Sequence, residues 1–233
     1  MQLLEVGRFE VDPFAFGQAG EPGPVFLDFP VDTLRATVSA AVLLPEHLNG
    51  RPRRALQPDP LAIDEAVDLL WLARRPLVIS GRGARGAGAP LQQLLSRLGA
   101  LYLDTGESRG LVPEDHPSVV AAMRGSVMAE ADVVLTVGRR LDFQLAFGSP
   151  AVFGDARFVR IGDCAGELRD NRRGAAEVLA TPAVALQALL DRAGDRAPAT
   201  DLDWARGNRS KHLARAGKLA TSMAQAAPGS DGL

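Results

Sequence analysis

A glycine-rich hexapeptide is the segment of this chain whose residue types and spacing most clearly suggest chemistry. Gly81-Arg82-Gly83-Ala84-Arg85-Gly86 has the spacing G-x-G-x-x-G, follows the apolar run at residues 77–80 and precedes a predicted helix over residues 90–98. Asp104 ends the next apolar run, about 20 residues further on. In such a pattern the glycines let the backbone approach a pyrophosphate, the helix N-terminus attracts the anion, and the acid binds a ribose. Taken alone, it predicts an NAD-binding domain.

The segment after the hexapeptide is looser than a compact dinucleotide turn. Ala87, Gly88 and Ala89 stand before Pro90, where the helix is expected to begin. In the compact turn the last glycine already packs the helix on the strand. The competing interpretation is a flexible turn between a strand and a helix in a chain rich in alanine and glycine.

Other groupings of reactive residues are weaker. Asp115-His116 with Ser108 or Ser118 has the composition of a hydrolytic triad, but no nucleophile-elbow sequence accompanies it, so a solvated turn is favoured. Cys164 has no histidine nearby in sequence to activate it and is interpreted as a small buried residue. Five basic residues near the C-terminus are expected on a solvated helix face: Arg206, Arg209, Lys211, Arg215 and Lys218.

The composition excludes several classes of protein. The 233 residues include 26 Lys+Arg, 28 Asp+Glu and 46% hydrophobic residues, which fits neither a disordered chain nor a general nucleic-acid binder. One cysteine and three histidines exclude an intramolecular disulfide and a Cys/His zinc cluster. Residues 1–20 lack the pattern of a signal peptide, and no apolar run approaches the ~20 residues that cross a bilayer. A cytoplasmic globular protein with no membrane or nucleic-acid partner is expected.

The alternation of predicted strands and helices indicates the fold class. Several strands are continuous apolar runs, which are typical of a parallel sheet buried on both faces. We therefore predict an α/β fold, a doubly wound parallel Rossmann-like sheet with an N-terminal extension and a C-terminal helix. Strands are expected at residues 77–80, 100–103, 133–138, 157–161 and 177–179, and helices at residues 59–74, 90–98, 126–131 and 181–193.

The two ends of the chain have a different character. Residues 25–30 predict a further buried strand, closed by Pro30, and the following stretch to residue 58 shows no sustained periodicity. Residues 201–226 predict one long helix, in which Trp204, Leu213 and Leu219 are candidates for packing.

Three segments together resemble the thiamine-diphosphate-dependent enzymes related to acetolactate synthase, oxalyl-CoA decarboxylase and 2-hydroxyacyl-CoA lyase. The first is GPVFLDFPVD at residues 23–32, which resembles the end of the pyrimidine-binding domain of that family. The second is RPLVISG at residues 75–81, together with GLVPEDHP at residues 110–117. The third is EADVVLTVGRRLDF at residues 130–143. Their order and spacing are similar to those of the central domain, and the resemblance covers residues 21–192.

The resemblance implies a domain division and a nucleotide site. Residues 1–34 would be a remnant of the pyrimidine domain, 35–57 a linker, 58–193 a six-stranded Rossmann-like central domain, and 194–233 a linker and a C-terminal helix. The central domain binds ADP or FAD in some members of the family and nothing in others. Gly162 stands where an acid usually follows the fourth strand, with Asp163 one position later. The implied nucleotide-facing residues are Gly81, Gly83, Thr105, Gly138, Arg140, Asp142 and Asp163.

The resemblance also implies what a complete enzyme would need. Thiamine diphosphate and Mg²⁺ are bound in the family by a glutamate of the N-terminal domain and a Gly-Asp-Gly…Asn motif of the C-terminal domain, which this sequence does not show. The partners would be these catalytic domains or a homologous subunit, in a homo-oligomer. Three functions stay open: an incomplete, non-catalytic member of the family whose central domain is structural or binds ADP or FAD, an independent NAD- or nucleotide-binding module, and an accessory subunit that acts through a partner.

Overall fold

The computed structural model describes residues 26, 28, 30–37 and 55–225, and the chain divides into two units, Met1–Arg54 and Ala55–Leu233. In the first unit the described residues form one short helix, α2 (Val31–Arg35), in a stretch where the sequence predicts no element. Phe26, Asp28 and Pro30 are not in a strand, and the rest of the strand expected at residues 25–30 lies outside the described residues.

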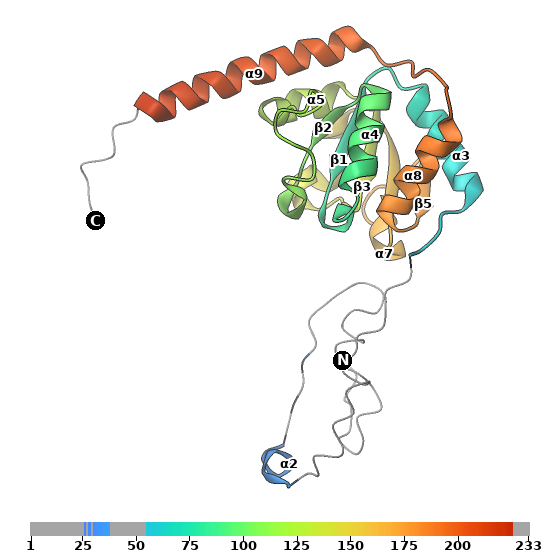
Figure 1. Cartoon of the computed structure of the whole chain (residues 1–233), viewed down its shortest axis with the longest axis vertical. Coiled ribbons are helices and arrows are strands. Elements are labelled where there is room, and N and C mark those ends of the chain that lie inside the picture. The colour runs from blue at the N-terminus through green and yellow to red at the C-terminus, as the bar shows by residue number, and fades with distance from the viewer. Residues whose placement is uncertain (1–25, 27, 29, 38–54, 226–233) are drawn as a thin grey trace. The chain divides into compact units, whose positions relative to one another are not determined.

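A five-stranded, all-parallel sheet forms the centre of the second unit (Figure 1). The predicted strands are confirmed, each to within one residue at either end. The resemblance implies a sixth strand, which the described part of the chain does not contain. The spatial order is β2-β1-β3-β4-β5, with the strands β1 (Pro76–Ser80), β2 (Leu101–Leu103), β3 (Val133–Val137), β4 (Arg157–Gly162) and β5 (Ala176–Leu179).

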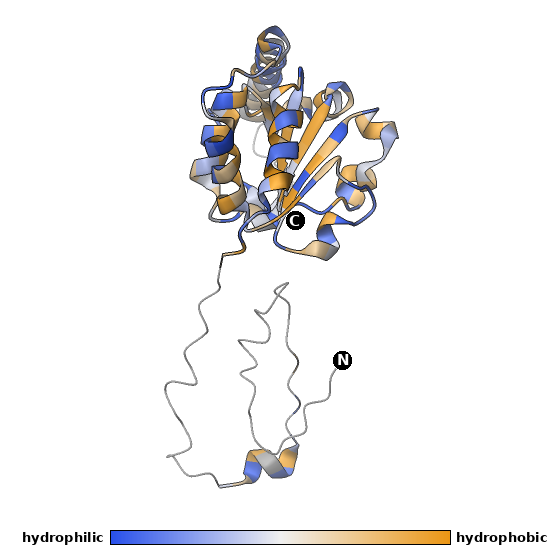
Figure 2. Ribbon diagram, turned by 90° about the vertical axis from the view of Figure 1, so that its right-hand side faces the viewer, coloured by the Kyte–Doolittle hydropathy of each residue, from blue (hydrophilic) through white to orange (hydrophobic). Residues whose placement is uncertain are grey.

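Helices cover both faces of this sheet, which confirms the doubly wound α/β fold. Successive side chains of a strand point to opposite faces, so Val78 joins one apolar cluster while Leu77 and Ile79 join the other. The strands are correspondingly the most hydrophobic part of the molecule (Figure 2). One face is packed by α3 (Pro60–Trp71), α4 (Gly88–Leu98) and α8 (Pro182–Ala193), and the other by α5 (Arg124–Glu130) and α6 (Pro150–Phe153).

Local sequence signals set the ends of these helices. Asp59 caps α3, with its side chain accepting a hydrogen bond from the Leu61 amide at 2.9 Å. Gly99 ends α4 at φ 62°, a left-handed conformation that favours glycine. Helix α4 begins at Gly88, two residues before the predicted Pro90. The loop after β1 forms a short 3₁₀ turn, η3 (Arg82–Ala84), and this turn uses fewer residues than the loop expected from the sequence.

The long helix predicted near the C-terminus is present as α9 (Leu202–Gln225). Its first half packs on the domain. Trp204 contacts the apolar cluster on which α5 packs. The Arg209 guanidinium donates to the Val119 and Asp115 carbonyls. The prediction that Leu213 and Leu219 pack against the domain is wrong, since their exposed fractions are 54% and 63%. The buried positions of this helix are polar instead, at Asn208 and His212.

Candidate functional site

The order of the strands places a topological switch point between β1 and β3. After β1 the chain adds β2 on one side of it and then returns to add β3 on the other. In doubly wound sheets ligands bind outside the carboxyl ends of the strands at such a point. Gly81 follows β1 and Gly138 follows β3, so the predicted glycines lie at this position.

Three of the predicted site glycines contact one another there. The Gly83 amide donates to the Gly138 carbonyl at 2.9 Å. A Cβ added to Gly138 would lie 2.4 Å from the Gly83 carbonyl carbon, and one added to Gly81 would lie 2.7 Å from the Gly138 carbonyl oxygen. Gly138 also has a φ of 53°, which residues with a side chain rarely adopt. These glycines are therefore required by the close approach of two loops, with or without a pyrophosphate.

Thr105 is committed to a buried cluster of hydroxyl groups. Its Oγ1 donates to the Ser80 carbonyl at 2.6 Å, and its amide donates to Ser108 Oγ at 3.0 Å. Ser80 Oγ in turn contacts the Tyr102 hydroxyl, whose pKa is raised above its ordinary value by burial. The cluster holds the loop after β2 to the end of β1, so the structure gives Thr105 a positioning role.

The hydrolytic triad considered from the sequence is not assembled. Ser108 Oγ contacts Ser80 and Thr105, whereas the His116 ring contacts Ser96 Oγ and accepts a hydrogen bond from the Ser118 amide. The Ser118 contact is thus made by its backbone and not by its hydroxyl. His116 therefore acts as a turn residue, as the favoured interpretation predicted.

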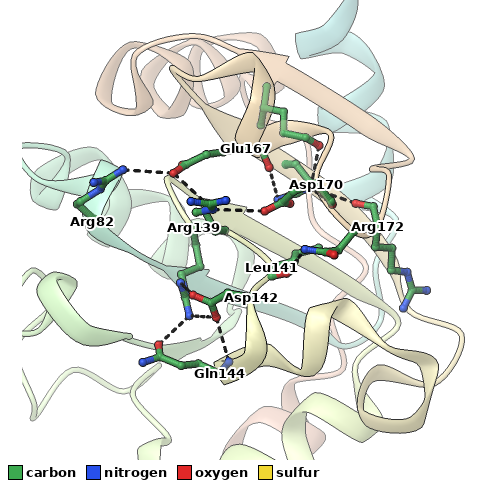
Figure 3. Close-up of polar contacts among 12 residues, drawn as sticks. Arg82, Arg139, Leu141, Asp142, Gln144, Glu167, Asp170 and Arg172 are labelled. Atoms are coloured by element: carbon green, nitrogen blue, oxygen red, sulfur yellow. Dashed lines mark hydrogen bonds and ion pairs between the residues drawn. The ribbon is translucent and has the colours of Figure 1, made fainter. Parts of the chain in front are cut away.

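A clamp between Arg139 and Asp142 shapes the loop after β3 (Figure 3). Arg139 Nη1 and Nη2 donate to the two Asp142 carboxylate oxygens at 2.9 and 2.8 Å, and Nη2 also donates to Gln144 Oε1. Burial pushes the pKa of Asp142 upward, but the hydrogen bonds and charge of Arg139 outweigh it and hold the pKa below its ordinary value. Asp142 is thus bound to its own loop, and Arg139, which sequence reasoning passed over, is its partner.

Arg140 converges with Arg82 on one carboxylate oxygen. Glu167 Oε1 lies 3.2 Å from Arg82 Nη2 and 3.9 Å from Arg140 Nε. The two guanidinium side chains are about half exposed, at 49% and 56%, whereas that of Glu167 is only 17% exposed. Figure 3 shows Arg82 reaching Glu167 from the loop after β1. Two cations from the two loops of the switch point therefore meet at one anionic atom.

Arg160 fixes the loop that carries Glu167. It lies inside β4 with 1% of its side chain exposed. Its two terminal nitrogens donate to the Asp170 carboxylate and to four backbone carbonyls of the loop, those of Glu167, Leu168, Asp170 and Arg172. The sequence signal for this role was a charged residue within an otherwise apolar strand, because a buried guanidinium requires nearby acceptors.

Asp163 and Cys164 begin the same loop. Asp163 is exposed directly after β4, and Cys164 is half-buried at the start of α7 (Ala165–Leu168), where the sequence led us to expect a buried residue. Glu167 and Asp170 pair with Arg140, and Glu167 also pairs with Arg82. The sequence pattern did not single out either of these acids.

The described residues lack two other kinds of functional element. They contain no group of three or more His, Cys, Asp or Glu side chains that could hold a metal ion. None of the helices within them combines the length and the apolar composition needed to cross a membrane.

Comparisons with known proteins agree on one family. The family model for the central domain of thiamine pyrophosphate enzymes matches residues 63–189. Oxalyl-CoA decarboxylase of Escherichia coli K12 is 32% identical over 189 residues, which cover 80% of this chain and 34% of that protein. 2-Hydroxyacyl-CoA lyase 1 of Mus musculus is 32% identical over 181 residues, covering 70% and 30%. A probable acetolactate synthase of Mycobacterium bovis is 33% identical over 159 residues, covering 65% and 27%.

The fold is also similar to a solved structure. A protein described as a thiamin diphosphate-dependent enzyme from Mycobacterium smegmatis superposes with a TM-score of 0.52 at 18% identity, covering 64% of this chain and 31% of that one. The likeness supports the fold alone. The chain spans about a third of the length of the curated relatives it matches.

Proposed function

The chain belongs to the thiamine pyrophosphate enzymes through their central domain, and on that premise we propose that it supplies the ADP-binding module of a carbon–carbon lyase. The lyase would be of the oxalyl-CoA decarboxylase and 2-hydroxyacyl-CoA lyase type, which includes two of the relatives named above. The ligand would be ADP itself or the ADP portion of FAD. The chain by itself would not be catalytic, and catalysis would require thiamine diphosphate and Mg²⁺ on other domains.

The observation that carries this proposal is the convergence of Arg82 and Arg140 on one oxygen at the switch point. A guanidinium binds phosphate oxygens through charge-assisted hydrogen bonds. Both side chains are about half exposed, so an incoming diphosphate can reach them. Helix α4 follows the loop of Arg82, and its N-terminus adds a partial positive charge at the same edge of the sheet.

The residues present fit an ADP group better than a thiamine cofactor. The described part of the chain offers no cluster of metal-ligating side chains that would suit Mg²⁺ and its bound diphosphate. We therefore assign no step of the thiamine reaction to these residues. When bound elsewhere in a complete enzyme, thiamine diphosphate would supply the carbanion chemistry, while this domain would bind and orient the nucleotide.

The dehydrogenase alternative loses its main support. The G-x-G-x-x-G spacing predicted an NAD site because glycines let a pyrophosphate approach. In the structure Gly81 and Gly83 are instead explained by their contacts with Gly138. An accessory or purely structural role has no specific observation in its favour.

Calorimetric titration of the purified chain with ADP, FAD and NAD tests the proposal. We expect ADP or FAD to bind more tightly than NAD. Loss of one charge-assisted contact typically costs ~1.5–3 kcal/mol, so Arg140→Ala and Arg82→Ala should each weaken ADP binding by roughly 10- to 150-fold. Arg173→Ala is the matched control. This exposed arginine lies just before β5, at the amino end of the strands, and pairs with Glu177. Equal affinity of all variants, or preference for NAD, would contradict the assigned site.

A further inference from the structure

Two exposed phenylalanines lie close in sequence to the proposed phosphate contacts. Phe143 and Phe147 belong to η6 (Phe143–Gly148), a short 3₁₀ segment in the loop after β3. Their exposed fractions are 75% and 54%. In the part of the chain that the structure describes, the stacked rings are those of Phe153 and Phe158, so neither exposed ring has an aromatic partner there. Apolar side chains exposed together on a surface are typical of a binding site.

The backbone of η6 is strained and yet firmly held. Ala146 and Phe147 have φ values of 47° and 54°, a left-handed conformation that residues with a side chain rarely adopt. The Phe147 amide donates to the Asp142 carbonyl at 2.9 Å, and Arg124 Nη2 donates to the Gln144 carbonyl at 2.9 Å. Strained segments persist only where their surroundings fix them, and they are concentrated at ligand-binding sites. The strain therefore supports a binding role for η6.

The segment begins at the same edge of the sheet as the proposed phosphate contacts. Arg139 directly follows Gly138 at the switch point and binds Gln144 Oε1 at 2.8 Å (Figure 3), which holds the start of η6 there. Phe143 lies three residues after Arg140, a stretch of chain that spans at most about 11 Å. A nucleotide whose diphosphate contacts Arg140 can therefore place its base on η6.

Resting on the proposed ADP site, we propose that Phe143 and Phe147 bind the adenine base of the nucleotide, with Phe143 stacked on its flat face. Aromatic side chains stack on bases because every base has a π-face. The same contact removes apolar ring surface from water, which is favourable. The site would then hold a nucleoside diphosphate at both ends, with arginines at the phosphates and phenylalanines at the base. Inorganic pyrophosphate, which has no base, would bind more weakly than ADP.

Titration of ADP and inorganic pyrophosphate into the wild-type chain and two variants of Phe143 tests the inference. Loss of the ring in Phe143→Ala should weaken ADP binding by about 5- to 150-fold and leave pyrophosphate binding unchanged. Tyrosine keeps the ring, so Phe143→Tyr should bind ADP within about twofold of the wild type. Phe147→Ala should also weaken ADP binding, and FAD should follow ADP in each variant because it carries the same adenine.

Leu72→Ala is the matched control. Leu72 is also a large exposed apolar residue, but it lies between α3 and β1, at the amino end of the strands. Its replacement should leave the affinities for ADP and pyrophosphate unchanged. Thermal denaturation of all variants checks that each remains folded.

The outcomes separate this inference from the proposed function. Measurable and equal ADP affinity in the wild type and Phe143→Ala would overturn the base contact and leave the phosphate site intact. Equal weakening of ADP and pyrophosphate, or no recovery in Phe143→Tyr, would also overturn it, because a disturbed loop would then be the cause. Weakening of FAD alone would assign the ring to the flavin and overturn the adenine contact. Absence of ADP and pyrophosphate binding in the folded wild type would overturn the inference and the proposed function together.

Discussion

Arg160 carries a buried charge inside the sheet. Such a charge is stable only when its hydrogen-bonding partners are in place. Replacement by methionine fills similar space but leaves the Asp170 carboxylate and four loop carbonyls without their donor. We expect Arg160→Met to lower the free energy of unfolding by about 3–5 kcal/mol, measured by urea denaturation. Arg157→Met, at the exposed first residue of the same strand, should change it by less than about 0.5 kcal/mol. Similar losses in both variants would contradict this account of Arg160.

Gly138 gives a second test at the scale of one residue. An alanine there must adopt a φ of 53° and places its Cβ 2.4 Å from the Gly83 backbone. The left-handed conformation alone costs ~1–2 kcal/mol, and the contact forces the two loops apart. We therefore expect Gly138→Ala to lower the melting temperature by several degrees or more. Gly125→Ala within α5, where nothing lies within 4 Å of the added Cβ, should raise it slightly. An unchanged melting temperature of Gly138→Ala would show that the loops can separate freely.

At the scale of elements, we expect the docking of α9 to depend on the protonation of His212. Its Nδ1 accepts a hydrogen bond from the Ala122 amide at 3.2 Å, which only the neutral ring can do. Desolvation by burial and the charge of Arg209 lower the pKa of His212, although Glu114 acts in the opposite direction. Because the unfolded chain then binds the proton more readily, stability is full above the ordinary histidine pKa of about 6.5 and falls as the pH drops toward the lowered pKa.

The expected result is a chain whose free energy of unfolding decreases between pH 7.5 and pH 5.5. His212→Asn keeps an acceptor near the Ala122 amide and removes the titrating ring, so the decrease should be smaller in that variant. His116→Asn is the control for the other histidine whose pKa is lowered, again first by burial. Urea denaturation of the three proteins at both pH values makes the comparison. A pH dependence unaltered by His212→Asn would place the effect on other groups.

At the scale of the whole molecule, the chain corresponds to the central domain of its family. The family model for the central domain accounts for residues 63–189, and the curated relatives are about three times as long as the matched region. We therefore expect the purified chain, with thiamine diphosphate and Mg²⁺ added, to show no turnover of oxalyl-CoA or 2-hydroxyacyl-CoA, and calorimetry to show no tight binding of thiamine diphosphate. Turnover by this chain alone would refute the proposed division of labour. Restored turnover with the remaining domains of a relative would support it.

Much of the fold was predictable because strands and helices leave local signals. The runs at residues 77–80 and 133–138 are apolar throughout, as strands buried on both faces must be, and Asp59 with Pro60 marks a helix start. The start of α4 was wrong by two residues because η3 uses the glycine-rich loop differently from a compact turn. The prediction that Leu213 and Leu219 pack was wrong. The spacing of apolar residues along a helix does not show whether another part of the protein lies opposite them.

The sequence by itself determined the family, the parallel α/β fold and the loops that gather at the switch point, because these follow from apolar runs, turn residues and motifs that are local in the chain. Only the tertiary structure decided what the site residues do. Gly81 and Gly83 meet Gly138, and Arg82 and Arg140 meet at Glu167, across separations of 27 residues or more along the chain. Such contacts depend on the order of strands in the sheet, which brings distant loops to one edge, and a linear sequence pattern does not encode which of several charged side chains will pair there.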